Sequence, residues 1–224
     1  MKNLFIFCFL MVNVVGRAQE GCSPYYPSKT GQTLVVHQLN KKGKLNVVTE
    51  YRIQSATDSI ITLNTALFDK KGKEIVTGNF KVTCLGEETV IEPESIIDPS
   101  TLKQFQNMKY SITGDGIRLP NTLEVGQHLP DSAVEMKVDA GIMNMNVSVT
   151  MTDRKVERKE QLTTPAGTFD CYVISYTNTL TMGTSKAQYA TQWIAKGMGM
   201  IQQEIRKENG KLISKSILNE VRTE

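Results

Sequence analysis

Residue types that carry out catalysis are few in this chain and lie far apart in its sequence. His37 and His128 are the two histidines, and so the two imidazoles that could act as a general base beside a nucleophile. His37 follows two valines in a strand-like pattern, and His128 lies in a turn that reads Gly-Gln-His-Leu-Pro. No Gly-x-Ser-x-Gly sequence is present. Adjacent acids such as Glu87 and Glu88 are typical of solvated loops. Because these residues include no recognisable catalytic set, we expect that the protein is not an enzyme.

Metal and cofactor chemistry find equally little support. The histidines and cysteines lack the close spacing of a zinc site, and the Gly-Lys pairs lack the spaced glycines and following helix of a phosphate-binding loop. Thioether pairs in Met143-Asn-Met145 and Met198-Gly-Met200 have the chemistry to bind Cu(I). Methionines two apart in a strand also share one core face, where they fill gaps. We favour that interpretation and expect no metal and no cofactor.

The methionines also support a binding hypothesis, because flexible thioethers adapt to irregular apolar shapes. In this hypothesis an apolar cavity holds a lipid-like ligand. We predict that its lining includes Met136, Met143, Met145, Met151 and Trp193.

Three cysteines, Cys22, Cys84 and Cys171, follow the N-terminal apolar segment. Three is an odd number for an export compartment, where cysteines are expected in pairs. Loop closure does not choose a pairing, because a 22–84 or an 84–171 bond would each contribute roughly 4–5 kcal/mol. Cys22 lies in an N-terminal segment with no other tether, so we favour Cys22–Cys84. A Cys84–Cys171 bond and three free thiols are the alternatives.

The elements that position these residues are mostly strands. Polar and apolar residues alternate with a period of two, as in Phe80-Lys-Val-Thr-Cys84, which indicates half-buried strands of an antiparallel sheet. A helix is predicted at 98–108, with Asp98 as its cap. Strands are predicted near 31–39, 45–55, 59–68, 74–84, 88–93, 110–113, 117–119, 133–138, 143–152, 155–163, 171–181, 185–194, 198–206 and 212–222.

Glycine-containing turns separate the strands. Three near-copies of one turn occur at 40–44, 69–73 and 207–211. Their glycines stand where a type I turn closed by a G1 bulge requires a positive φ. Further tight turns are predicted at Gly167 and at Gly114-Asp115-Gly116. We expect the turn lysines to be solvated and to discourage edge-to-edge pairing. The glycines of the three repeated turns are Gly43, Gly72 and Gly210.

The N-terminus has the pattern of a secretory signal peptide. Lys2 precedes a 12-residue apolar run at 4–15, too short to span a bilayer as a helix, and Ala18 provides a cleavage site. We predict a signal peptide at 1–18 and one soluble domain at 19–224. A retained N-terminal helix or anchor, and lipid attachment at Cys22, are the alternatives. Removing Lys2 and Arg17 leaves 24 basic against 23 acidic residues. This near-neutral balance argues against nucleic-acid binding.

With these landmarks placed, the chain resembles a family of exported bacterial β-proteins. The family is labelled TapB-like or domain of unknown function 3108, and it is common in Bacteroidetes. Its Gly-Val-Gly-Leu-Val stretch corresponds here to Gly197-Met-Gly-Met-Ile201, which keeps the apolar pattern. The matching segments are Cys22-Ser-Pro-Tyr-Tyr-Pro27, Asp69-Lys-Lys-Gly-Lys-Glu74 with Val82-Thr-Cys84, Leu119-Pro120 with Leu123-Glu-Val-Gly126, Thr164-Pro-Ala-Gly-Thr-Phe-Asp-Cys171-Tyr172 and Trp193-Ile-Ala-Lys-Gly-Met-Gly199.

The resemblance implies a mainly β fold, a curved antiparallel sheet or incomplete barrel similar to the periplasmic lipoprotein carriers. It implies no activity and no site residues. Together with the methionines it favours a periplasmic binding module for an apolar ligand or a lipidated partner. The alternative is a non-catalytic accessory or structural envelope protein that acts through protein contacts. The cell surface and the extracellular space are alternative locations.

Overall fold

The computed structural model describes Cys22, residues 24–96, Phe105 and residues 108–139, 141 and 144–223. The predicted signal peptide, Met143 and most of the predicted 98–108 helix lie outside the described residues. The elements within them are β1 (Gln32–Asn40), β2 (Leu45–Ala56), β3 (Ile60–Asp69), β4 (Glu74–Leu85), β5 (Glu88–Ile91), η1 (Pro93–Ser95), β6 (Lys109–Gly114), β7 (Ile117–Pro120), β8 (Ser132–Asp139), β9 (Asn144–Thr164), β10 (Gly167–Met182), β11 (Thr184–Ala195), β12 (Gly199–Arg206) and β13 (Leu212–Thr223).

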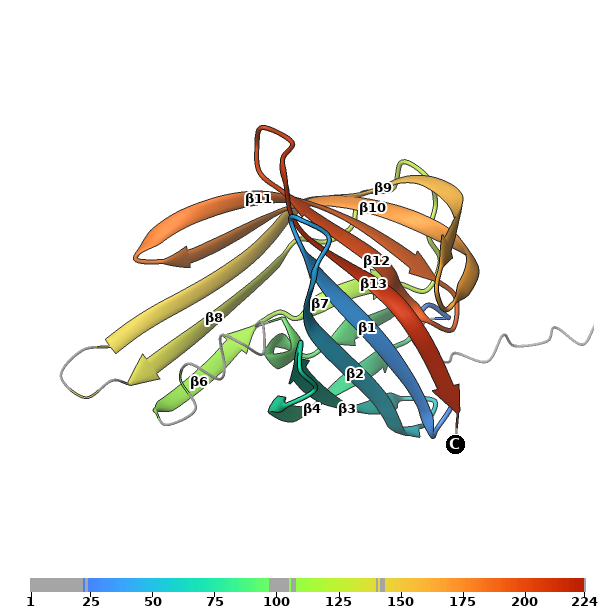
Figure 1. Cartoon of the computed structure of the whole chain (residues 1–224), viewed down its shortest axis with the longest axis horizontal. Helices are drawn as coiled ribbons and strands as arrows, with labels where there is room; N and C mark the ends of the chain where they lie inside the picture. The colour runs from blue at the N-terminus through green and yellow to red at the C-terminus, as the bar shows by residue number, and fades with distance from the viewer. Residues whose placement is uncertain are drawn as a thin grey trace, which may run out of the picture.

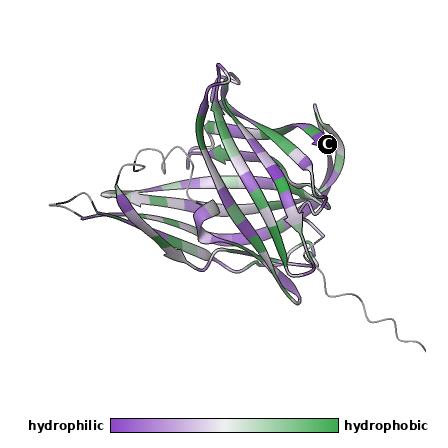
Figure 2. Ribbon diagram, turned by 90° about the horizontal axis from the view of Figure 1, so that it is seen from below, coloured by the Kyte–Doolittle hydropathy of each residue, from purple (hydrophilic) through white to green (hydrophobic). Residues whose placement is uncertain are grey.

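All thirteen strands form one antiparallel sheet in the order β6-β8-β9-β10-β11-β12-β13-β1-β2-β3-β4-β5-β7. The sheet curls on itself (Figure 1). Polar and apolar residues alternate along its strands (Figure 2), as expected when one face is covered and the other is solvated. The mainly β, incompletely closed fold predicted from the sequence is confirmed.

The two edge strands, β6 and β7, are one continuous segment of chain. The sequence predicts a tight turn between them, yet β6 pairs with β8 and β7 pairs with β5, at opposite edges of the sheet. Gly114 and Gly116 allow this path because both have positive φ. A Cβ on Gly116 would lie 2.2 Å from the carbonyl oxygen of Ile91. The link therefore ties the two edges without closing the sheet.

The three repeated turns adopt one conformation. In the first, Gly43 N–H donates to Asn40 O at 2.8 Å, and the Asn40 side chain accepts from the N–H groups of Lys42 and Lys44. Asp69 makes the same side-chain contacts in the second turn. The strand register shifts beside each turn, as a bulge requires. The predicted turn glycines Gly43, Gly72, Gly167 and Gly210 all have positive φ.

The N-terminal segment 24–27 packs against the turn between β11 and β12. Tyr25 is buried, and Gly197 N–H donates to Pro24 O at 2.6 Å. A Cβ on Gly199 would make ordinary van der Waals contact with the Pro27 ring, at 3.7 Å, so glycine is favoured there by its φ of 74° and not by a lack of space. With Leu119, Leu123 and other buried apolar residues, Tyr25 fills one end of the curled sheet.

Candidate functional site

The concave side of the sheet encloses a cavity of about 500 Å³, here called the concave cavity. Its size falls in the range of ~300–1,000 Å³ that small-molecule sites occupy. Its aliphatic lining comprises Val36, Val47, Leu67, Ile96, Ile117, Val147, Val149, Met151, Leu180, Met200 and Ile205. The other described lining residues are Tyr51, Tyr176, Gln38, Asn46, Thr49, Asn178, Gln188, Gln192, Gln203, Ser214, Ser216 and Arg154. The cavity is amphipathic rather than purely apolar.

The predicted methionine lining is distributed differently in the structure. Met151 lines the concave cavity. Met136 is fully buried and packs with Phe105 and the valines of β8 and β9, so it belongs to the core. Met145 lies near the exposed start of β9, and Met143 lies outside the described residues. Strand alternation predicts that a methionine faces inward, but it does not distinguish one that faces the cavity from one that packs against a residue distant in sequence, such as Phe105.

Trp193 and Cys171 lie together in a buried cluster, and neither lines the concave cavity. The Trp193 indole N–H donates to the carboxylate of Glu160. Burial is the main cause that raises the pKa of the Cys171 thiol to about 11, so the thiol remains protonated near neutral pH. Cys171 therefore behaves as a small apolar residue.

Cys22 and Cys84 form a disulfide, the pairing favoured from the sequence, with their Cα atoms 4.7 Å apart. The bond connects the N-terminal segment to the end of β4. Cys22 packs against a buried cluster that contains Ile53, Ile61 and Val82. The disulfide thus anchors the segment that carries Tyr25 to the sheet.

Arg154 is the one charged side chain among the described residues that line the concave cavity. It is 4% exposed. Its Nη1 donates to Pro130 O at 2.6 Å and to Arg118 O at 3.0 Å. Burial is the main effect that lowers the pKa of Arg154, opposed by Tyr26, Tyr176 and Asp131. An arginine remains charged in proteins despite such a shift. The cavity therefore contains a buried positive charge.

A backbone irregularity turns Arg154 inward. Asp153 has a φ of 56°, the one positive φ outside glycine among the described residues. The register of β9 and β10 shifts beside it, between Ser175 and Thr177. Such a bulge changes the direction of the following side chain. It also joins the two strands predicted at 143–152 and 155–163 into one long strand, β9.

Polar side chains on the neighbouring strands extend the polar part of the cavity beside Arg154. The Tyr176 hydroxyl accepts from Nε2 of Gln203, and burial raises the pKa of Tyr176 to about 12. Two residues along β10, Asn178 has a buried Oδ1 with no hydrogen-bond partner among the described residues. Gln188 stands opposite Asn178 on β11. The cavity therefore has unused hydrogen-bonding capacity beside its aliphatic lining.

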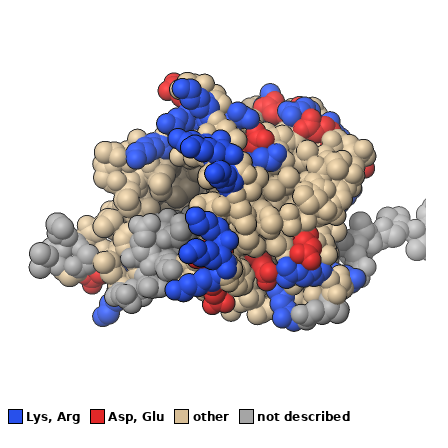
Figure 3. All heavy atoms as spheres, in the orientation of Figure 1, with Lys and Arg blue, Asp and Glu red and all other residues tan. Residues whose placement is uncertain are grey.

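Basic turns border one rim of the curled sheet. The β12–β13, β1–β2 and β3–β4 hairpins are successive in the sheet, so their turns lie at the same end. Gln38 and Asn46 of the cavity lining flank the β1–β2 turn. Figure 3 shows a hollow flanked by Lys and Arg side chains. The exposed lysines of the three turns, the basic rim, are Lys41, Lys42, Lys44, Lys70, Lys71, Lys73, Lys207 and Lys211.

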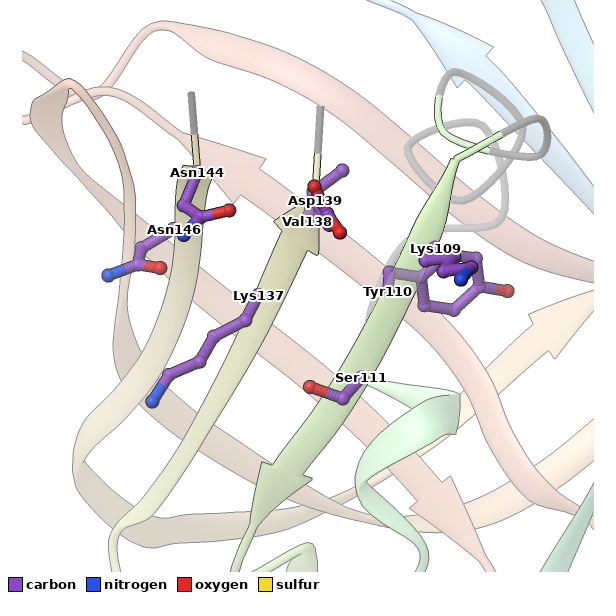
Figure 4. Close-up of a pocket in the computed structure, with 8 residues that line it drawn as sticks. All are labelled: Lys109, Tyr110, Ser111, Lys137, Val138, Asp139, Asn144 and Asn146. Carbon is purple, nitrogen blue, oxygen red and sulfur yellow. The ribbon is translucent and has the colours of Figure 1, made fainter. Parts of the chain in front are cut away.

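A second hollow of about 530 Å³ lies over the ends of β6, β8 and β9 (Figure 4). Its side chains come from three neighbouring strands and include Lys109, Lys137 and Asn146. Lys137 forms a surface ion pair with Glu135 at 3.8 Å. No buried charged side chain faces this hollow among the residues described there. We therefore place the candidate site in the concave cavity.

The catalytic and metal candidates from the sequence do not come together. His37 lies on β1. His128 lies before β8, where its backbone forms an isolated antiparallel β-bridge with Lys155 of β9. Within the described ranges, no three His, Cys, Asp or Glu side chains form a metal-binding group. The helical residues that the structure describes include no segment long and apolar enough to cross a membrane.

Sequence reasoning missed Arg154, although a signal for it is present. The inward-facing positions of β9 run 147, 149 and the half-buried 151, and then 154 and 156, so the period of two changes phase at Asp153. Such a change indicates a bulge. The Arg that follows it takes an inward position that would otherwise be apolar.

Two solved bacterial structures share this architecture. One, from Bacteroides fragilis, is described as exported with a YmcC-like fold; it has a TM-score of 0.77 and 19% identity, covering 90% of this chain and 100% of that one. The other, from Parabacteroides distasonis, is described as a lipoprotein; it has a TM-score of 0.75 and 21% identity, covering 90% of this chain and 99% of that one. No curated protein matches the sequence. The DUF3108-like family model matches residues 29–218, and the chain therefore belongs to that family.

Proposed function

We propose that this chain is an exported, non-catalytic binding protein of the cell envelope, and that its concave cavity holds the apolar part of a small ligand. The observation that carries the proposal is the cavity itself, about 500 Å³ enclosed by strands from both halves of the curled sheet. Preformed cavities with an apolar lining and a few polar groups are the usual form of small-molecule sites.

The apolar strip of the cavity has the form of a channel for an aliphatic chain. Val147, Val149 and Met151 alternate along β9 and all line the cavity. Leu180 lies on β10 toward the rim and is 37% exposed. Burying aliphatic surface against such a strip contributes roughly 25 cal/mol per Å² before the costs of association. We infer that an acyl chain, free or attached to a partner, fits this strip.

Three observations support an envelope location. The apolar run at 4–15 has the pattern of a signal peptide. The Cys22–Cys84 disulfide is a bond that persists in oxidising compartments. The Bacteroides fragilis and Parabacteroides distasonis proteins are described as exported and as a lipoprotein. We propose the periplasm as the specific compartment.

Binding of Nile red, an uncharged apolar dye, tests the function. The matched variants are Ser216→Trp and Lys215→Trp, because Ser216 lines the cavity and the adjacent Lys215 does not. We expect saturable binding at one site in the wild type and in Lys215→Trp, and at least about tenfold weaker binding in Ser216→Trp, which fills the cavity. The change corresponds to about 1.4 kcal/mol.

Equal dye binding by both variants would place the dye outside the cavity and refute the proposal. No dye binding by the wild type, together with a protein partner recovered in stoichiometric amount from the native envelope, would favour the accessory role through protein contacts instead.

A further inference from the structure

The geometry points to an anionic amphiphile as the ligand: its carboxylate or phosphate group binds Arg154, and its aliphatic chain runs along β9 toward the basic rim. This inference rests on the proposed function and names the class of ligand.

Arg154 has donors available for an anion. A guanidinium has five N–H groups, and the two hydrogen bonds that Arg154 makes to described residues both run from Nη1 to backbone carbonyls. Neither Nε nor Nη2 donates to any described residue, and none of the ion pairs among the described residues includes Arg154. Asp131 interacts with Arg154 only through longer-range electrostatics and is itself exposed.

A buried and unpaired charge is costly unless a partner compensates it. The carbonyls of Arg118 and Pro130 orient the guanidinium but supply no negative charge. A carboxylate or phosphate can accept two parallel bonds from an arginine, which gives strong and directional binding. The Tyr176 hydroxyl, which accepts from Gln203, still has its own proton to donate beside Arg154. The polar end of the cavity thus matches an oxyanion.

The apolar strip fixes the direction of the chain. Met151, Val149 and Val147 lead from Arg154 toward the start of β9, which lies at the same end of the sheet as the lysine turns. From 154 to 147 the strand rises roughly 20 Å. A headgroup at Arg154 therefore leaves the chain in contact with this strip.

The basic rim also favours anionic ligands. Its eight exposed lysines create a positive field at the end of the sheet where the three turns lie, and Figure 3 shows a hollow flanked by Lys and Arg side chains. Charged rims of this kind raise the local concentration and the association rate of ligands of opposite sign, and salt reduces the effect.

Calorimetric titration with dodecanoate, dodecyl phosphate and dodecanol tests the inference on the wild-type protein, with the two anions below their critical micelle concentrations and dodecanol below its solubility limit. We expect at least one of the two anions to bind about tenfold or more tightly than dodecanol, as a charge-assisted hydrogen bond provides. The tighter of the two anions identifies a carboxylate or a phosphate headgroup. Dodecanol that binds as tightly as both anions would overturn the headgroup assignment while the cavity function stands. A wild type that binds neither these probes nor Nile red would overturn both.

Arg154→Met should abolish the preference and retain binding of dodecanol. Arg158→Met is the matched control, because Arg158 lies on the same strand, is exposed and pairs with Glu160 at 2.9 Å. It should keep the preference. An Arg154→Met protein that folds and keeps the preference would overturn the assignment. Should Arg154→Met fail to fold, Arg154→Lys keeps the charge without the planar fork, and should reduce the preference.

Discussion

Removal of the Cys22–Cys84 disulfide should destabilise the whole domain and not only its N-terminal segment. The bond closes a loop with a sequence separation of 62 residues. In the chain-entropy model a loop of this length contributes about 4 kcal/mol to the free energy of unfolding. Measured effects fall below the model value, so we expect a loss of about 2–4 kcal/mol. For a domain of this size that is a fall in Tm of roughly 5–15 °C.

The structure explains why the loss is shared by the fold. The tethered segment buries Tyr25 among the residues that fill one end of the sheet, and Pro24 O accepts from Gly197 N–H. Without the bond to Cys22, the unfolded chain has more conformational entropy, so the same packing leaves a smaller free energy of unfolding. Cys22→Ser and Cys84→Ser should therefore lower stability by similar amounts, and the double variant should lose little more, because both remove one bond.

Urea unfolding with and without reductant measures the effect. The wild type should show a lower midpoint when reduced, and Cys22→Ser should show no dependence on reductant. Peptide mapping without reduction should recover a linked 22–84 pair. An unchanged midpoint after complete reduction would show that the disulfide does not stabilise the fold, and a linked 84–171 peptide would refute the pairing.

Cys171→Ser should lower the free energy of unfolding, measured with urea, by about 1–3 kcal/mol, because it puts a hydroxyl in an apolar cluster. A variant as stable as the wild type would contradict this. Gly116→Ala should cost at least about 1 kcal/mol more than Gly86→Ala, because both have positive φ but only the Gly116 Cβ would meet backbone, at 2.2 Å. Hydrogen bonds from Arg158 and then Trp193 lower the pKa of Glu160. Their stabilisation is complete above the ordinary glutamate pKa of about 4.3 and is lost as pH falls through the lower folded value. Fluorescence of Trp193, the only tryptophan, should change in that lower window and not in Glu160→Gln.

The local parts of this fold could be read from the sequence. The described residues form thirteen strands where fourteen are predicted, and the repeated lysine turns form the hairpins that their glycines indicate. These features depend on the period of side chains and on turn geometry, which neighbouring residues determine. The one strand too many came from the bulge at Asp153, where the alternation changes phase.

The candidate site depends on contacts between residues distant in sequence, so less of it could be predicted. Pairing of β5 with β7, and of β6 with β8, places the Gly114–Gly116 link across the two edges of the sheet. Phe105 covers Met136. The sequence pattern predicts that Met136 and Met151 face inward but does not indicate which one a distant segment covers. Arg154 was missed because a lone arginine in a strand is usually solvated.

A crystal structure of the wild-type protein with dodecanoate would show directly whether the concave cavity holds the ligand and whether Arg154 binds its headgroup. We expect one ligand in the concave cavity, with carboxylate oxygens about 3 Å from Arg154 Nε or Nη2 and the chain against Met151, Val149 and Val147. A carboxylate at the rim with the chain inside would contradict the role of Arg154. A ligand bound elsewhere beside an empty cavity would contradict the proposed function.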